Sequence, residues 1–434
     1  MPSQPNKGAL RLAAWTFVAA WALRLVAAYT VGSFFNLGRS DMERIAKSVV
    51  ERHAFAGELA PGVPTAGESP GYVLVIALLF QLFGQGVFAE VIKVLACTAM
   101  ASLRCALSVW LAAQLGMGRA VVFVTAVFSV LWIGALGTEL QGDWDPPYTA
   151  VWLILLLSYH MRSPAETRTP MRSFLLGATW TLAAYFNFTI LSIAVGMCVR
   201  DVIANRAKVW PAIQWSLCVV AGVIVVLSPW AIRNRIVLGE WLFTRTLLGY
   251  NLSISYRDGA HWSEPVNNHP SSPGKPDDIS ISPAPWLNEK LQPEVQRMGE
   301  VAWDRQQKEK GVRWILAHPG TSLRLMAQHA FFFWFPPWPG AFMKMLGAVP
   351  WPFAIAQWML TLMAASGLVR LWKKAPDAAK TLGVALLWFP LAYYLVSWSS
   401  RYRAPIEWIL VLLAAVAIGG ILDDIRQGRA TDRL

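Results

Sequence analysis

Charged side chains are scarce in this chain of 434 residues. Asp, Glu, Lys and Arg together make up 15% of the sequence, whereas hydrophobic residues make up 55%, and the mean hydropathy is +0.41. An ordinary soluble domain has about 25% charged residues. The composition therefore argues against a soluble protein and predicts an all-α polytopic membrane protein.

Cysteines and familiar catalytic signatures are nearly missing as well. No Gly-rich phosphate loop, Walker sequence or Ser-His-Asp order stands out, and we find no convincing internal repeat or separate soluble domain. The chain is therefore expected to form one domain, 1–434. The histidines at His261 and His269 lack metal-ligand spacing and are expected to be structural or superficial. The four cysteines lie in apolar runs without zinc-type spacing, so we expect no disulfide: Cys97, Cys105, Cys198 and Cys218.

The charge that is present is mostly positive, with a net value of +12. The cations stand between apolar runs and form no basic domain with interleaved aromatics, so we expect no nucleic-acid partner. Under the positive-inside rule, cations in this position are cytoplasmic anchors. The 23 tryptophans agree with a membrane protein, because indole rings favour the membrane–water interface.

Alternating basic clusters predict about ten spans, two half-elements and two extracytoplasmic regions, at 32–72 and 232–321. The first apolar run, 9–31, is long for a signal peptide and is interpreted as an uncleaved helix. The run 71–83 is too short to cross a bilayer and should be re-entrant or interfacial. The run 174–199 should form a tight pair of helices with a turn near Asn187. The other expected spans are 87–115, 120–136, 147–160, 212–230, 355–371, 382–398 and 406–422.

The polar stretch 40–72 is unusually long for a connector and is predicted to carry the active site. Its apolar residues fall on one face between Asp41 and Phe55, which is typical of a short interfacial helix. Asp41 is the candidate general base for an acceptor hydroxyl or amine, and the alternative is a helix cap. Glu43 is a weaker catalytic candidate that is expected to face solvent. Glu68 is either a second acid of the site or an ordinary loop residue.

A second acidic cluster follows in the GTELQGDWDPP segment, where Glu139, Asp143 and Asp145 are expected on the same side as Asp41. The simple interpretation is a solvated loop. The functional alternative is a further acid near the pocket, or oxygen ligands for Mg²⁺ or Mn²⁺. A divalent metal is therefore possible, and the spacing alone does not identify one.

Several arginines lie on the side that should be poor in cations. Arg233, Arg401 and Arg403 stand near the expected outer ends of helices, and guanidinium groups pair well with phosphate oxygens. The alternative is snorkelling to the interface. Arg24 lies within the first apolar run, so it should face the bundle interior, paired with an acid or lining a pocket. These four arginines are the candidates for binding a donor phosphate.

Several segments together resemble a known family. AWALRLVAAYT, SDMERIAKSVVERHAFA and PTAGESPGYVLVIALLFQLFG, followed by SPWAIRNRIVLGEW, NNHPSS, GEVAWDRQQKEKGVRWILAHPGTSLRL and RYRAPIEWILVLLAA, are similar in order to bacterial family 39 glycosyltransferases. These are relatives of protein O-mannosyltransferases and lipid A aminoarabinose transferases, with the GT-C membrane fold. The resemblance covers nearly the whole chain.

The resemblance implies a transferase that uses a polyprenyl-phosphate-linked sugar, with Asp41 matching the first-loop aspartate. Three departures concern the acceptor and donor sites. This chain has Asp-Met-Glu where many relatives have Asp-Glu, and it stops after its last expected span without the periplasmic domain that some relatives add. The basic residue that some relatives place before a Pro-Pro-Leu-Tyr-like motif is missing, and Glu68 occupies that neighbourhood.

The sequence thus predicts a GT-C glycosyltransferase of the bacterial inner membrane, with its active site on the extracytoplasmic face. It would transfer a sugar from a polyprenyl-phosphate donor to a glycan, lipid or protein acceptor. A lipid-linked sugar or lipid transporter is the alternative; it would explain the spans and outer arginines but not the two large polar regions. A non-catalytic membrane scaffold is a third interpretation, in which the Asp-Met-Glu change marks lost activity.

Overall fold

The computed structural model describes residues 7–35, 40–132, 134, 136–140, 142–163, 168–205, 209–260, 285, 288–336 and 350–431. Over these residues the fold is all-α, as predicted, with 17 α-helices. The β-pairing found within them is an isolated bridge between Ala56 and Pro64. His261, His269 and much of the second polar region lie outside the described residues.

Six of the described helices are long and apolar enough to cross a membrane. This supports the prediction of a multi-pass membrane protein, whereas the expected count of about ten spans is not shown. The six are α1 (Lys7–Thr30), α4 (Val87–Gln114), α10 (Val209–Leu238), α16 (Pro350–Lys374), α17 (Pro376–Trp388) with the 3-10 helix Phe389–Leu395 that continues it, and α18 (Glu407–Thr431).

The remaining expected spans correspond to shorter helices. These are α5 (Arg119–Leu131), α7 (Pro146–Arg162), α8 (Pro170–Ala184) and α9 (Ile190–Ala204). At a rise of about 1.5 Å per residue, helices of this length reach less than the roughly 30 Å of a hydrocarbon core. The predicted helix pair is confirmed, because α8 and α9 are separated by the turn at 185–189 that contains Asn187.

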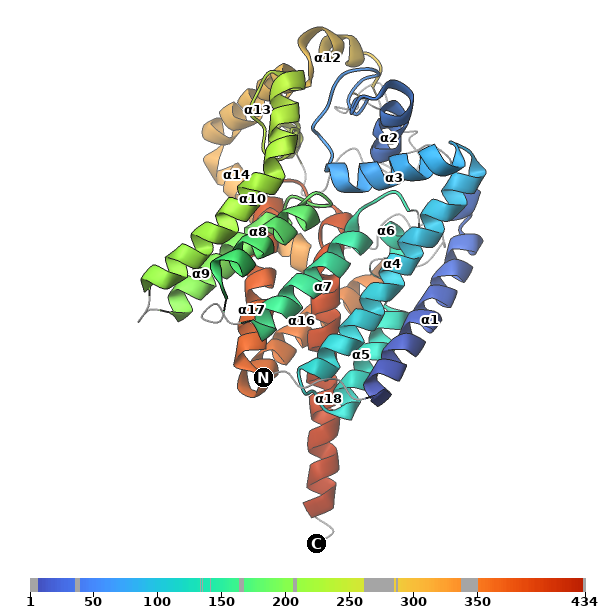
Figure 1. The fold of residues 1–434 in the computed structure, drawn as a ribbon, viewed down its shortest axis with the longest axis vertical. Helices are drawn as coiled ribbons and strands as arrows, with labels where there is room; N and C mark the ends of the chain where they lie inside the picture. The colour runs from blue at the N-terminus through green and yellow to red at the C-terminus, as the bar shows by residue number, and fades with distance from the viewer. Residues whose placement is uncertain are drawn as a thin grey trace.

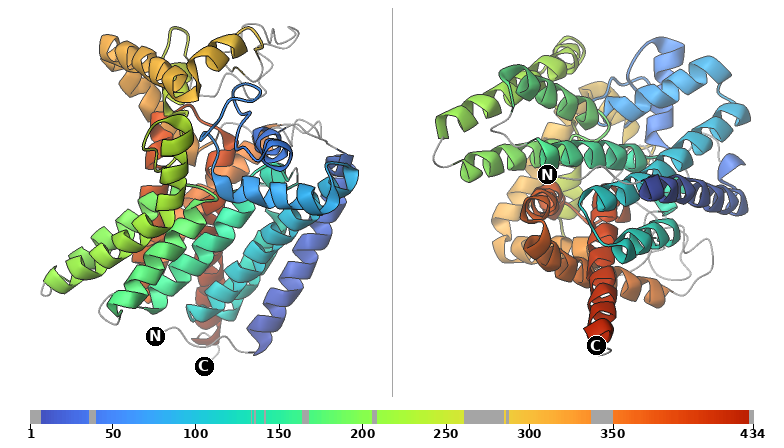
Figure 2. Two further views of the ribbon diagram at one scale, coloured as in Figure 1. Left: turned by 45° about the horizontal axis from the view of Figure 1, so that its top comes forward. Right: turned by 60° about the horizontal axis from the view of Figure 1, so that its bottom comes forward.

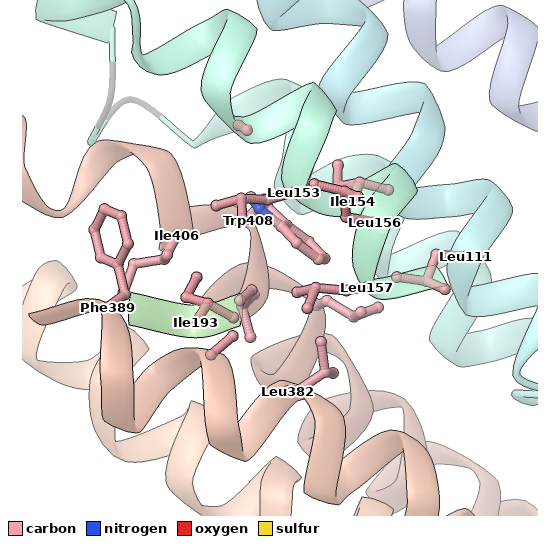
Figure 3. Packing of buried hydrophobic residues seen from close by; sticks show 14 of the residues in the cluster. Leu111, Leu153, Ile154, Leu156, Leu157, Ile193, Leu382, Phe389, Ile406 and Trp408 are labelled. Atoms are coloured by element: carbon pink, nitrogen blue, oxygen red, sulfur yellow. The ribbon is translucent and has the colours of Figure 1, made fainter. Parts of the chain in front are cut away.

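The core lies where α7, α9, α17 and α18 meet (Figure 3). Every residue from 403 to 417 is buried, which is expected of a helix that is apolar on all sides. Leu153, Ile154 and Leu157 of α7 pack in the same cluster as Leu382 of α17. The bundle is thus assembled around the first half of α18.

Glycines allow helices α8 and α10 to approach closely. A Cβ on Gly177 of α8 would lie 1.9 Å from the Val219 carbonyl oxygen of α10. In the same pair, a Cβ on Gly222 of α10 would lie 2.0 Å from the Phe174 carbonyl oxygen. Such reciprocal contacts are typical of helices that pack in lipid, where small residues bring backbones together.

One end of the bundle carries a cap of shorter helices (Figures 1 and 2). It contains α2 (Asp41–Arg52), α3 (Pro70–Phe83), α11 (Leu248–Ser255), α12 (Gln292–Met298) and α13 (Glu300–Ala317). Helix α3 runs across the ends of the upright helices in Figure 1, which agrees with an interfacial element. The helix α14 (Pro319–Trp334) leads from the cap back along the bundle.

The two polar regions meet in this cap. The Thr246 amide donates to the Ala66 carbonyl oxygen at 3.1 Å, and the Arg233 guanidinium donates to the carbonyl oxygens of Thr65 at 2.7 Å and Phe55 at 2.8 Å. The described parts of 32–72 and 232–321 therefore lie on one side of the bundle, as the sequence predicted. Helix α1 begins and α18 ends at the opposite side (Figure 1).

This arrangement predicts the labelling of single cysteines in a cysteine-free background. Glu51 and Lys308 are exposed in the cap and Lys374 is exposed at the other end. If the cap is extracytoplasmic, a membrane-impermeant maleimide added to intact cells should modify Glu51→Cys and Lys308→Cys, and Lys374→Cys only after permeabilisation. Modification of only one of the two cap positions would contradict the fold.

Candidate functional site

Helix α2 places the first two candidate acids. Ser40 is its N-cap, and the Ser40 hydroxyl accepts from the Glu43 amide at 3.2 Å. Asp41 is therefore the first helical residue, and the side chain that caps the helix belongs to Ser40. The Asp41 carboxylate instead forms an ion pair with Arg44, and 18% of its side-chain surface is exposed. Asp41 remains accessible at the edge of the cap.

Glu43 does not face solvent, so that prediction is wrong. The predicted amphipathic helix does form, and its buried residue Met42 packs in a cluster with Tyr72 of α3. The next residue, Glu43, is fully buried against α4, where it contacts the Lys93 ammonium. The periodicity identified the apolar face correctly. It did not reveal that a buried lysine on α4 completes that face.

Lys93 is the centre of a buried ionic cluster that we call the Lys93 cluster: Glu43, Glu90, Lys93 and Asp143. The Lys93 Nζ atom lies 2.9 Å from Glu90 Oε1 and 3.0 Å from Asp143 Oδ1, in addition to its contact with Glu43. Only 1% of the Lys93 side chain is exposed. Lys93 was not among the residues predicted from the sequence, although a lysine within the apolar run 87–115 is a recognisable signal.

Arg24 faces the bundle interior, as predicted, and of the two alternatives left open by the sequence it takes the pairing with an acid. Its Nε donates to Glu139 Oε2 at 2.8 Å, and Arg104 Nη1 lies 2.7 Å from Glu139 Oε1. All three side chains are buried, so the interpretation of Glu139 as a solvated loop residue is wrong. Burial raises the pKa of Glu139, but the Arg104 and Arg24 guanidiniums outweigh it and hold the pKa below its usual value.

Glu68 is buried in the loop that joins α2 to α3, and its partner is Arg245. Glu68 Oε1 lies 3.2 Å from Arg245 Nη2, whose side chain is 39% exposed. Burial raises the pKa of Glu68, and Arg245 and Arg401 oppose that rise. The negative charges of Asp41 and Asp145 increase it further. These five residues, which are far apart in the sequence, therefore lie close enough to interact electrostatically.

A second buried carboxyl lies behind Glu68. Burial and the neighbouring Glu68 raise the pKa of Glu58 well above its usual value, and the Thr65 hydroxyl donates to Glu58 Oε2 at 2.8 Å. A Cβ at Gly67 would lie 2.0 Å from that same oxygen, so a larger residue there would displace the Glu58 carboxyl. Glu300 of α13 accepts from the Ala66 amide at 2.9 Å. The loop between α2 and α3 is thus fixed both by a hydrogen bond within it, from Thr65 to Glu58, and by Glu300 of α13.

The 142–145 segment brings the second acidic cluster to the same region. Asp145 is buried and accepts from the Thr149 hydroxyl at 2.8 Å and from the Asn187 amide at 3.3 Å. Burial raises the pKa of Asp145 and of Asp143. Asp143 belongs to the Lys93 cluster, whereas Glu139 lies in a separate one. The three acids predicted as one cluster therefore serve different sites.

The candidate phosphate-binding arginines have different environments. Arg233 donates to loop carbonyls and lies over the Phe55 ring, at 5.5 Å from its centroid. Arg403 is buried, donating to the Trp334 carbonyl at 3.0 Å and to Glu407 at 2.9 Å. Arg401 lies over the Trp144 ring, 4.1 Å from its centroid, and is partly exposed.

These contacts indicate which guanidinium groups are accessible to a ligand. Binding a phosphate at Arg24 or Arg403 would require breaking buried ion pairs, and at Arg233 it would displace two loop carbonyl oxygens. Arg401 and Arg245 are exposed in part beside Glu68, where Arg245 also donates to the Gly67 carbonyl oxygen. Arg245 was missed by the sequence analysis, and its signal is a cation on the side that the positive-inside rule predicts to be poor in cations.

Potential metal ligands are grouped in the Lys93 cluster. Within the described part of the chain, oxygens of Glu43, Glu90 and Asp143 lie within 4.8 Å of one another. Carboxylate oxygens suit Mg²⁺ and Ca²⁺, but the Lys93 ammonium contacts all three groups. A metal at that point would have to displace Lys93.

No protein-family model matches the sequence, and the search of curated proteins finds no match. The function is therefore argued from the site itself. Its defining features are a partly exposed aspartate, a buried glutamate and two accessible guanidiniums at the capped end of an apolar helix bundle.

The Arg24–Glu139–Arg104 arrangement predicts a large stability effect. Glu139→Gln removes the charge that compensates two buried guanidiniums, and breaking a buried ion pair typically costs about 3–5 kcal/mol. Thermal unfolding in detergent should show a clear loss of stability. The control, Glu309→Gln, changes an exposed acid on α13 and should stay within about 0.5 kcal/mol of the parent. Equal stability of the two variants would contradict the assignment.

Proposed function

We propose that this protein is a membrane glycosyltransferase of GT-C type. It moves a sugar from a polyprenyl-phosphate-linked donor to an extracytoplasmic acceptor, at the outer face of a bacterial inner membrane. The observation that carries the proposal is the grouping of Asp41, Glu68, Arg245 and Arg401 in the cap, where the apolar helices end. The ordered resemblance to family 39 glycosyltransferases supports the same activity.

The cap offers the groups that sugar transfer from a lipid phosphate needs. The acceptor oxygen forms a bond to the anomeric carbon while the bond between that carbon and the phosphate oxygen breaks. The electron pair of the broken bond stays on the lipid phosphate, and the proton of the acceptor goes to the Asp41 carboxylate. Asp41 suits this role because 18% of its side-chain surface is exposed beside its ion pair with Arg44, whereas Glu43 is fully buried.

Arg245 and Arg401 are assigned to the departing phosphate. Negative charge develops on its oxygens as the bond breaks, and guanidiniums placed there beforehand stabilise it. Planar guanidiniums also bind phosphate through paired hydrogen bonds. Glu68 is a positioning residue in this scheme, because its carboxylate fixes the Arg245 side chain at 3.2 Å.

The first functional prediction concerns Asp41. Asp41→Asn preserves the shape of the side chain and leaves the Ser40 cap intact, so thermal stability should stay close to that of the parent. Turnover with a polyprenyl-phosphate sugar should fall at least about 10²-fold, the lower range for a general base. The matched control is Glu51→Gln, an exposed acid on the same helix, which should retain turnover.

Two outcomes would reject this role. Unchanged turnover in Asp41→Asn would remove Asp41 from the chemistry. Movement of the lipid-linked sugar across reconstituted bilayers, with no new glycosidic product and no effect of Asp41→Asn, would favour the transporter. Product formation is measured by mass spectrometry of the acceptor.

The second functional prediction separates two arginines that are neighbours in sequence. Arg401→Ala should raise the donor dissociation constant about 10–100-fold, since a hydrogen bond to a charged group contributes about 1.5–3 kcal/mol. Arg401→Lys keeps the charge but loses the planar fork, so its effect should be smaller. Arg403→Ala should instead lower thermal stability, because Glu407 loses its buried partner.

The control for this experiment is Arg305→Ala, which removes an exposed arginine paired with Glu240 on the cap. Donor binding should be unaffected in that variant. Equal donor affinity of Arg401→Ala and the parent would withdraw Arg401 from the phosphate site.

A further inference from the structure

The Lys93 cluster has the composition of a cation site built from protein oxygens. Three carboxylates from three segments converge on one point: Glu43 from α2, Glu90 from α4 and Asp143 from the segment before α7. All three side chains are buried. Glu43 Oε2 also has no hydrogen-bond partner, so the cluster contains an oxygen ligand that the protein does not use.

The geometry of these oxygens fits a divalent cation of the size of Ca²⁺. Oxygens that share one Ca²⁺ at about 2.4 Å are separated by at most about 4.8 Å, and the three groups lie within 4.8 Å of one another.

The occupant is Lys93 itself. Its ammonium contacts all three carboxylates and is shielded from solvent. A lysine ammonium is a compact point charge with three donors, which matches three converging acceptors. Because Lys93 belongs to α4, this cation is covalently attached to the bundle and cannot dissociate.

We propose that Lys93 is a built-in cation that occupies a carboxylate site of divalent-metal type and joins the Asp41 helix to the bundle. The cap then needs no divalent ion to hold α2 and the 142–145 segment in place. Removing the ammonium while leaving its space open should convert the cluster into a Ca²⁺ site. This inference does not depend on the proposed transferase activity, because its test measures stability and cation binding.

The experiment compares two substitutions that differ in the space they leave. Lys93→Ala removes the charge and opens room for an ion, whereas Lys93→Met removes the charge but fills the room with an uncharged chain of similar length. Thermal unfolding of the purified protein in detergent is followed with excess EDTA and with Ca²⁺. Lys93→Arg, which keeps a cation, serves as the folded reference.

We expect the unfolding temperatures of the parent and the variants to respond differently to Ca²⁺. The parent should unfold at the same temperature in EDTA and in Ca²⁺. Lys93→Ala should be less stable in EDTA and should gain at least about 3 °C in saturating Ca²⁺, since ligand binding to the folded state raises the unfolding temperature. Lys93→Met should show no such gain. Adding Asp143→Asn to Lys93→Ala removes one ligand and should abolish most of the calcium response.

Three results would overturn the proposal. One is the same unfolding temperature for Lys93→Ala in EDTA and in Ca²⁺. Another is a calcium response in the parent as large as in Lys93→Ala, which would locate the ion elsewhere. The third is a Lys93→Ala variant that cannot be purified folded in either condition although Lys93→Arg can, because an open divalent site would have accepted Ca²⁺.

Discussion

The compensation of buried charge is the constraint on which the rest of this structure depends. An uncompensated charge in an apolar bundle is costly, and this chain buries charged residues at several points. Glu139 lies between Arg24 and Arg104, Lys93 lies among three carboxylates, and Arg168 contacts Asp201 at 2.9 Å. Apart from the Glu90–Lys93 contact within α4, these contacts join different segments, so charge pairing determines how helices are placed against one another as well as their stability.

The same constraint separates structural charges from those that can meet a ligand. Arg24 and Arg403 are buried against Glu139 and Glu407, and Arg233 donates to loop carbonyl oxygens, so a phosphate there would leave those partners unpaired. Asp41, Arg245 and Arg401 have protein neighbours too, but part of each side chain is exposed. The proposed transferase therefore uses residues at the edge of the ionic network, and the network itself fixes the positions of their helices and loops.

The candidate site is assembled from segments that are distant in sequence. Arg245 lies in the second polar region and Glu68 in the first, and the contacts of Arg233 and Glu300 with the 55–66 loop join the two regions. Two buried carboxyls, Glu58 and Glu68, belong to the loop between α2 and α3, and burial raises the pKa of both. The Arg245 guanidinium opposes that rise at both carboxyls.

The sequence by itself determined the helical class, the amphipathic helix that begins at Asp41, the helix pair around Asn187 and the inward position of Arg24. Those features follow from local periodicity or from the high cost of a charge in an apolar run. Only the tertiary structure decided that Glu43 faces inward, that Lys93 and Arg245 are partners of the acids, and that the three acids of 139–145 belong to different sites. The physical reason is that ion pairs form between residues far apart in the sequence; Arg24 and Glu139, for example, are 115 residues apart. The periodicity of one helix shows which of its residues face inward, but not which charged residue of another helix they will contact.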